Sequence, residues 1–276
     1  MLEDVVTPTG PYRLRLMCRS GAWRGALVDG SEATAWQRPD GAVVVRAPTE
    51  EDLASARFML ALEDDTAEFH RRFGRDPLLG ATARALVGYR PLRLATVAHA
   101  ALRAVCGQLI EARKAAAIER SVLRHLDVSV ATRDDLCRLS PVDLRRSGLA
   151  TSRAATLVRL VRSFDLERLR DYDTAVVLQR LSHERGVGPW SVGVIALEGL
   201  GRFDHGLVGD LGLVKLLASL RGEWVTAEET AALLAPYEEW QGLAGQMLML
   251  GWSRGLIPGA DPDLGRRARL RTKRAA

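Results

Sequence analysis

The sequence is poor in cysteine and histidine. Its 276 residues include three cysteines, Cys18, Cys106 and Cys137, whose wide separation matches neither a disulfide framework nor a zinc or iron–sulfur spacing. The five histidines are scattered and show no metal-binding pattern. We therefore expect no cofactor and no metal bound by side chains. We also expect a reducing, cytoplasmic environment in which the cysteines are small buried hydrophobes.

Long hydrophobic runs are also missing. No apolar segment approaches the roughly 18 residues that a membrane span requires. The start, Met1-Leu2-Glu3-Asp4, has neither the basic region nor the apolar core of a signal peptide. The sequence therefore predicts no membrane partner. Its hydrophobic content of 47% is typical of a soluble globular protein.

Positive charge is concentrated in particular segments. The formal net charge is +5, but residues 264–276 hold six basic side chains and no acid, so the remaining body is close to neutral. Within that body, residues 138–170 carry eight arginines against three acids. Such a face can follow a phosphate backbone, and the basic tail can contact nucleic acid without sequence preference. A solvated surface is the alternative for both segments.

Short apolar runs separated by turn signals indicate strands in residues 1–47. The runs are Tyr12, Leu14 and Leu16 alternating with arginines, then 26–28 and 42–45, with turns at Asp29-Gly30 and Pro39-Asp40-Gly41. This pattern predicts a small antiparallel sheet of roughly three to five strands.

From Thr49 onward the pattern is helical. Thr49-Glu50-Glu51-Asp52 is a capping box, after which apolar residues recur at helical spacing between glycines and prolines. The predicted helices are approximately 50–62, 65–73, 77–87, 95–111, 114–126, 132–138, 141–146, 151–164, 173–182, 189–201, 210–220, 226–235 and 239–253. We therefore predict an α+β chain that is mainly α.

The segment Gly186-Val187-Gly188-Pro189 joins two of these helices. Its glycines permit a hairpin with positive φ angles, and Pro189 suits the first turn of the second helix. Free N–H groups at that helix start can bind a phosphate. Asp210 lies twenty residues beyond Trp190, after the second helix. A phosphate site followed by one carboxylate favours chemistry on a nucleic acid.

Together these segments resemble the helix-hairpin-helix DNA glycosylases. The hairpin with Leu207–Leu213 carries their Gly/Pro…Asp signature, and Leu102–Ile110 resembles the Gln-containing helix of the 3-methyladenine DNA glycosylase II family. The resemblance spans about 48–255 and implies a small antiparallel sheet followed by a two-lobed, all-α core. The implied domains are the β domain 1–47, the hairpin lobe 98–203, a second lobe of 48–97 with 204–264, and the basic tail 265–276.

The resemblance also implies a role for each site residue. Asp210 would be the catalytic carboxylate that stabilises an oxocarbenium-like sugar. The base pocket would comprise Trp190, Val194, Tyr237 and Trp240, with Val194 standing where relatives of broad range often carry an aromatic. The DNA contacts would be Gln108, the wedge Leu109, and Gly186, Val187, Gly188 and Ser191. For Asp210 the structural alternative is a helix N-cap, and for the apolar residues it is core packing.

The implied function is monofunctional base excision. Trp190 occupies the place where lyases of the superfamily carry a lysine, so no amine is present to form a Schiff base. The substrate would be damaged double-stranded DNA from which alkylated purines such as 3-methyladenine are excised. We expect a nucleoid-associated monomer with no obligate protein partner, and a monovalent cation is the family's frequent ligand at the hairpin carbonyls. Three alternatives stay open: a glycosylase for deaminated purines or uracil, a non-enzymatic DNA-binding protein, and a helical protein unrelated to DNA.

Overall fold

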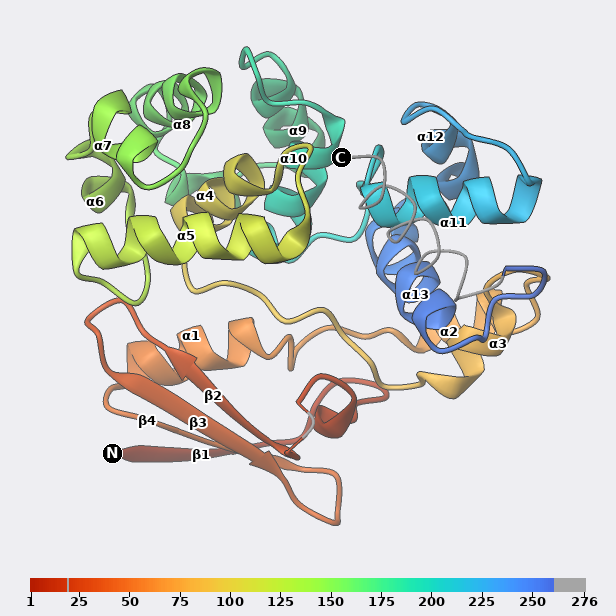
Figure 1. Cartoon of the computed structure of the whole chain (residues 1–276). Helices are drawn as coiled ribbons and strands as arrows, with labels where there is room; N and C mark the ends of the chain where they lie inside the picture. The colour runs from red at the N-terminus through yellow and green to blue at the C-terminus, as the bar shows by residue number, and fades with distance from the viewer. Residues whose placement is uncertain (19, 261–276) are drawn as a thin grey trace.

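Residues 1–47 build a four-stranded antiparallel sheet with the strand order β1-β4-β3-β2 (Figure 1). The strands are β1 Leu2–Val6, β2 Ala22–Ala26, β3 Glu32–Gln37 and β4 Val43–Ala47. Val44 of β4 pairs with Val5 on one side and Trp36 on the other. The computed structural model describes residues 1–18 and 20–260, so the basic tail predicted at 265–276 lies outside the described residues.

The strand predicted around Tyr12, Leu14 and Leu16 is wrong. Leu14–Leu16 forms a short 3-10 helix, η1, and Tyr12 and Leu14 are buried. The side chain of Gln37 supplies the backbone partners of this segment. It accepts a hydrogen bond from the Leu14 N–H and donates one to the Tyr12 carbonyl, each at 3.0 Å. Because a side chain satisfies these groups, the segment needs no neighbouring strand.

The sequence pattern does not predict β1, because Glu3 and Asp4 are poor strand formers. In the structure these carboxylates pair with Arg46 and Arg57, each at 2.6 Å. Arg57 belongs to α1, Glu50–Met59, whose apolar residues join the core beneath the sheet. This helix, which the predicted domain division places in the second lobe, therefore packs on the N-terminal sheet instead.

The remaining helices lie close to their predicted positions. They are α2 Ala67–Phe73, α3 Gly80–Ala85, α4 Val97–Gly107, α5 Ala112–Leu126, α6 Arg133–Cys137, α7 Pro141–Arg146, α8 Thr151–Ser163, α9 Thr174–Ser182, α10 Pro189–Val194, α11 Leu211–Arg221, α12 Glu229–Leu234 and α13 Gln241–Ser253. A π-helical segment, η3 Ile195–Leu200, continues α10. Two 3-10 segments, η2 Glu167–Asp171 and η4 Ala235–Trp240, complete the helical part.

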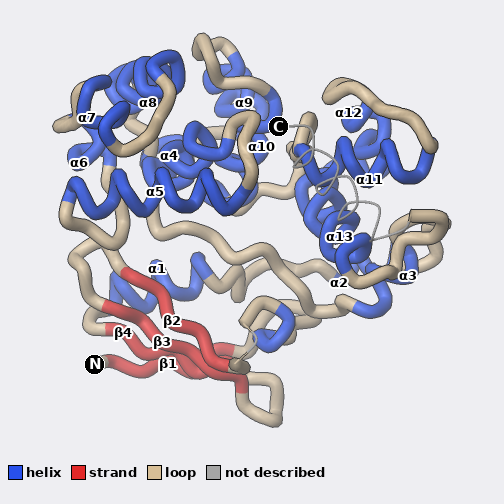
Figure 2. The backbone as a smooth tube through the Cα atoms, viewed as in Figure 1, coloured by secondary structure: helices blue, strands red, loops and turns tan. Residues whose placement is uncertain are grey.

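The helices form two groups above the sheet (Figure 1). In one, α4 is central and packs against α5, α8, α10 and η3. In the other, α13 packs against α3, α11 and α12. The long loop from α3 to α4 runs between the sheet and the helices (Figure 2). It is tied to the first group by a hydrogen bond of 2.8 Å from the Leu94 N–H to the Glu198 carbonyl.

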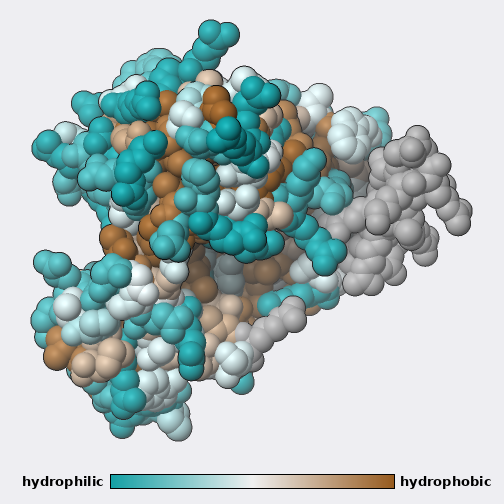
Figure 3. Space-filling model, turned by 60° about the vertical axis from the view of Figure 1, so that its left-hand side comes forward, coloured by the Kyte–Doolittle hydropathy of each residue, from teal (hydrophilic) through white to brown (hydrophobic). Residues whose placement is uncertain are grey.

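Hydrophilic side chains cover most of the face seen in Figure 3, and hydrophobic ones gather where the sheet meets the helices. Two large hydrophobic clusters lie behind this distribution. One fills the sheet and α1, and the other runs continuously through both helical groups. The shared helical core fixes the position of one group against the other, and with it the walls of any site between them.

Candidate active site

A cavity of about 1920 Å³ opens between the two helical groups. Its walls are the α4–α5 loop, the hairpin with α10 and η3, the start of α11, the loop 224–228 and the end of α13. The predicted site residues that line it are Gln108, Leu109, Gly186, Val187, Gly188, Trp190, Ser191, Val194 and Asp210. Residues far apart in the sequence thus meet at one cavity.

Asp210 lies where α11 begins, and both of its carboxylate oxygens are held. Oδ1 accepts a hydrogen bond of 2.7 Å from the Gly212 N–H, which makes Asp210 the N-cap of the helix. Oδ2 accepts one of 2.8 Å from the indole Nε1 of Trp190. Hydrogen bonds to a charged acceptor are strong and directional, so the carboxylate has a defined orientation at the cavity wall. Asp210 is therefore both the N-cap of α11 and a residue of the cavity wall.

The backbone before Asp210 is fixed from a second direction. Gly209 adopts a φ of +82°, and its N–H donates to the Thr230 hydroxyl at 2.7 Å. That hydroxyl in turn donates to the Ala227 carbonyl at 2.5 Å, and Thr230 is fully buried. The sequence gives no sign of this role, because a single threonine in a helix has no distinctive pattern.

Trp190 connects three parts of the site. Its ring lies so close to Gly107 that a Cβ added there would be 2.5 Å from the nearest ring atom. The last residue of α4 must therefore be glycine for the tryptophan to fit. With its Nε1 bonded to Asp210, the indole spans the space between α4 and α11.

At one position of the hairpin, Gly186, the backbone conformation requires glycine. Gly186 has a φ of +88°, and a Cβ there would be 2.3 Å from the Thr156 hydroxyl oxygen. Gly188 has a φ of −88° and serves as the N-cap of α10, so the expected positive φ is wrong for this residue. Pro189 stands in the first turn of α10, as predicted. Around Gly188 there is open space, which leaves its backbone accessible.

Two of the predicted DNA contacts are buried. Val187 and Ser191 are only 5% and 2% exposed. Val187 packs in the helical core, and the Ser191 hydroxyl accepts a hydrogen bond of 2.9 Å from the Gln108 amide. Their side chains are therefore not free to contact DNA, and only the hairpin backbone remains available for a phosphate.

The α4–α5 loop places Leu109 in solvent beside the cavity. Leu109 is 96% exposed and has a φ of +52°. The helix predicted over 95–111 ends at Gly107, because the next residue, Gln108, leaves the helical conformation with a ψ of 122°. Gln108 holds this turn by donating from Nε2 to the Gly186 carbonyl at 2.8 Å as well as to Ser191. Gln108 thus ties the loop to the hairpin.

Tyr237 and Trp240 do not line the cavity, so their prediction as base-pocket residues is wrong. Tyr237 is 3% exposed, and its hydroxyl donates to Asp76 at 3.3 Å. Trp240 stacks on Phe203 with 5.8 Å between the ring centroids. Both aromatics are used in packing the second helical group.

Other residues line the cavity without having been predicted. They are Glu198, Arg103 and Glu119 on its inner wall, Met249 and Trp252 of α13, Lys215 of α11, and Trp224. Met249 and Trp252 are three residues apart and so lie on one helix face. Trp224 is 74% exposed. The sequence could have indicated Glu198 as a cavity residue, since Trp190, Val194 and Glu198 follow one another at intervals of four and so lie on one face of a helix.

The hairpin carbonyls are the predicted ligands of a monovalent cation. The Arg185 carbonyl accepts hydrogen bonds from the Arg159 guanidinium and the Thr156 hydroxyl, and the Gly186 carbonyl accepts one from Gln108. A cation at these two oxygens would have to displace existing donors, one of them positively charged. These carbonyls therefore do not fit a bound cation.

Two kinds of feature are absent from the described residues. Within 1–18 and 20–260, no group of histidine, cysteine, aspartate and glutamate side chains could hold a metal ion. No helix in the same part of the chain has the length and hydrophobicity of a membrane crossing.

Sequence comparison finds relatives among DNA repair enzymes, although no family model matches the chain. The chain is 25% identical over 201 residues to the DNA-3-methyladenine glycosylase of Bacillus subtilis, covering 66% of either chain. It is 28% identical over 207 residues to the probable bifunctional transcriptional activator/DNA repair enzyme AlkA of Mycobacterium tuberculosis, covering 71% of this chain and 41% of that protein. The chain thus matches just under two thirds of the first relative's length and less than half of the second's.

Solved structures share the fold. The 3-methyladenine DNA glycosylase from Archaeoglobus fulgidus superimposes with a TM-score of 0.75 at 18% identity, covering 92% of this chain and 98% of that one. The Clostridium acetobutylicum 8-oxoguanine glycosylase/lyase in complex with double-stranded DNA gives 0.69 at 19% identity, covering 89% and 88%. The chain therefore has the fold of the helix-hairpin-helix DNA glycosylases, and in sequence it resembles the 3-methyladenine DNA glycosylases.

Proposed function

We propose that this protein is a monofunctional DNA glycosylase of base excision repair. It hydrolyses the N-glycosidic bond of alkylated purines, such as 3-methyladenine, that are flipped out of duplex DNA, and it leaves an abasic site. The observation that carries the proposal is the Asp210 carboxylate, oriented by Trp190 at the wall of a large cavity whose rim bears the exposed Leu109. The sequence similarity to a DNA-3-methyladenine glycosylase supports the same reaction.

Leu109 is the proposed wedge. A leucine that is 96% exposed gains nothing from burial in the free protein, and its φ of +52° carries a strain of about 1–3 kcal/mol. Both features are explained if the side chain enters the base stack and fills the space that a flipped nucleotide vacates. Gln108 holds the wedge loop against the hairpin, whose open backbone at Gly188 contacts a phosphate next to the lesion.

Asp210 is the proposed catalytic residue. As the glycosidic bond breaks, the departing base takes the bonding electrons and the sugar develops positive charge. The carboxylate stabilises that charge, and its remaining lone pairs orient the attacking water and accept a proton from it. A purine alkylated on nitrogen leaves easily because it is already cationic, so a single carboxylate suffices.

The absence of lyase activity rests on Trp190, which stands in the cavity wall where the superfamily's lyases carry a lysine. A bifunctional enzyme is the second candidate, favoured by one observation: Lys215 of α11 also lines the cavity. Lys215 is five residues past Asp210, roughly 140° further around the helix, so the two side chains leave the helix in different directions. We expect product DNA to remain unnicked until alkali is added, and borohydride to trap no protein–DNA adduct. If the native protein gives a trapped adduct and the Lys215→Ala variant gives none, the enzyme is bifunctional, with Lys215 as the amine that forms the Schiff base.

The active unit is proposed to be a monomer in the DNA-containing cytoplasm, without an obligate protein partner, since one chain supplies every residue named above. The hairpin lobe is formed by residues 98–203, and the second lobe by residues 67–97 with 204–260. The two lobes would bind DNA from opposite sides of the cavity.

The test is chromatography of the free bases released from alkylated duplex DNA. The native protein is expected to release alkylpurines, while Asp210→Asn releases none and still binds abasic-site duplex. If the protein releases only hypoxanthine or uracil, it is a glycosylase for deaminated bases and not for alkylated purines. Binding to duplex without release of any base would make the protein a DNA-binding module.

A further inference from the structure

Glu198 is one of the glutamates that line the cavity in addition to Asp210. Trp190, Val194 and Glu198 follow at intervals of four on the continuous helix α10–η3, and all three line the cavity. Glu198 lies in the π-helical part, a rare conformation that often occurs at functional sites. Its side chain is 20% exposed. It is thus placed deeper along the same helix face that carries the tryptophan bonded to Asp210.

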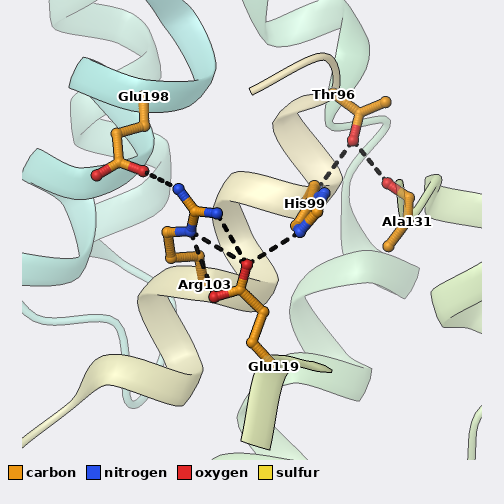
Figure 4. Close-up of polar contacts among 6 residues, drawn as sticks. All are labelled: Thr96, His99, Arg103, Glu119, Ala131 and Glu198. Atoms are coloured by element: carbon orange, nitrogen blue, oxygen red, sulfur yellow. Dashed lines mark hydrogen bonds and ion pairs between the residues drawn. The ribbon is translucent and has the colours of Figure 1, made fainter. Parts of the chain in front are cut away.

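Glu198 belongs to a charged network with Arg103, Glu119 and His99 (Figure 4). Nη1 of Arg103 donates to Glu198 Oε2 at 2.8 Å, and Nη2 of the same guanidinium donates to Glu119 Oε1 at 2.9 Å. His99 contacts Glu119 through Nε2 at 3.1 Å. Two carboxylates therefore share one guanidinium. Arg103 thus supplies a single guanidinium for two carboxyl groups.

The two carboxylates differ in their surroundings. Glu119 accepts hydrogen bonds from both His99 and Arg103, and although burial opposes this, these bonds lower its pKa below the ordinary value. Glu198 has a single donor, and its Oε1 has no hydrogen-bond partner among the described residues. Burial raises the pKa of Glu198, aided by the nearby Glu119, while Arg103 and His99 act in the opposite direction. Glu198 is therefore the less stabilised carboxylate of the two, and one of its oxygens is left without a donor among the described residues.

We propose that Glu198 is a specificity-determining residue that favours a cationic base in the cavity. This inference rests on the proposed glycosylase function and gives the two carboxylates different roles. Asp210 acts on the sugar, whereas Glu198 faces the flipped base and compensates its positive charge, with Oε1 free to accept a hydrogen bond from the base edge. A desolvated carboxylate is costly without a partner, and a cationic purine supplies that partner where a neutral one does not.

The experiment compares Glu198→Gln with the native protein on two duplexes, one alkylated and one containing inosine. The amide keeps the hydrogen bond from Arg103 and removes the charge. We expect release of the cationic alkylpurine to fall by on the order of tenfold or more, as expected when a contact to a charged group is lost. Release of neutral hypoxanthine should fall much less or rise. Binding to abasic-site duplex, which offers no base, should not change.

The outcomes separate the two proposals. If the native protein releases no base, the glycosylase proposal fails. If it releases alkylpurine and Glu198→Gln releases it equally fast, only the role of Glu198 fails. Equal losses on alkylpurine release and abasic-site binding would make Glu198 a purely structural residue. Should the glutamine variant not fold, Glu198→Met, which is also uncharged and of similar length, must show the same selective loss.

Discussion

Replacing Trp190 by phenylalanine tests how Asp210 is oriented. The substitution keeps an aromatic side chain at this position and removes the 2.8 Å hydrogen bond from the indole Nε1 to Oδ2 of Asp210. A hydrogen bond to a charged group contributes about 1.5–3 kcal/mol, which corresponds to roughly 10- to 100-fold in rate if it is needed in the transition state. Oδ1 keeps its bond to the Gly212 N–H, so the lower part of that range is expected.

The assay is single-turnover base release from a duplex with one alkylated purine. Trp190→Phe should slow the chemical step by about tenfold or more and leave the affinity for abasic-site duplex unchanged. Trp36→Phe is the matched control, because Trp36 lies in β3 of the sheet, away from the cavity. A Trp190→Phe rate within about twofold of the native rate would refute the positioning role, since even the weakest charged hydrogen bond exceeds that difference.

Two further substitutions test the DNA-facing loops. Leu109→Ala should weaken binding to abasic-site duplex more than binding to undamaged duplex in an equilibrium titration; equal losses would contradict the wedge. Gly186→Ala should lower the free energy of unfolding by about 1–3 kcal/mol, since alanine there combines a positive φ with a clash against Thr156. Gly188→Ala, with a negative φ and open space, should change unfolding in denaturant much less, and equal destabilisation would refute the strain argument.

Most helix positions could be predicted from the sequence because their signals are local. Thr49 is the N-cap of α1, although the reciprocal bond of a full capping box is not formed, and Pro189 stands in the first turn of α10 as the pattern predicts. The sheet was harder, because strand pairing depends on distant partners. Leu14 alternates like a strand residue yet is bound by the Gln37 side chain, and the acidic β1 forms because Arg46 and Arg57 pair with its carboxylates.

In the candidate site, too, the residues attached to local motifs could be predicted, whereas contacts between distant segments could not. The hairpin, Asp210 and Leu109 could be located because the family resemblance attaches each to a motif, and the structure brings them to one cavity. The same resemblance placed Tyr237 and Trp240 in the base pocket, but packing within the second helical group takes both aromatics away from the cavity. The hydrogen bond from Trp190 to Asp210 and the Arg103 network depend on how α4, η3 and α11 pack, which no spacing in the sequence encodes.

The central claim is that Asp210 performs the chemistry, and one measurement tests it most directly. Single-turnover release of alkylpurine is compared between the native protein and Asp210→Asn, at protein concentrations that saturate the duplex. The amide oxygen can still cap α11, whereas the amide NH2 cannot accept the hydrogen bond from Trp190. Folding and abasic-site binding should persist, because the helix cap is kept. The rate should fall by at least about 100- to 1,000-fold, the loss typical of removing a transition-state stabiliser. An Asp210→Asn rate close to native would contradict the catalytic role of Asp210.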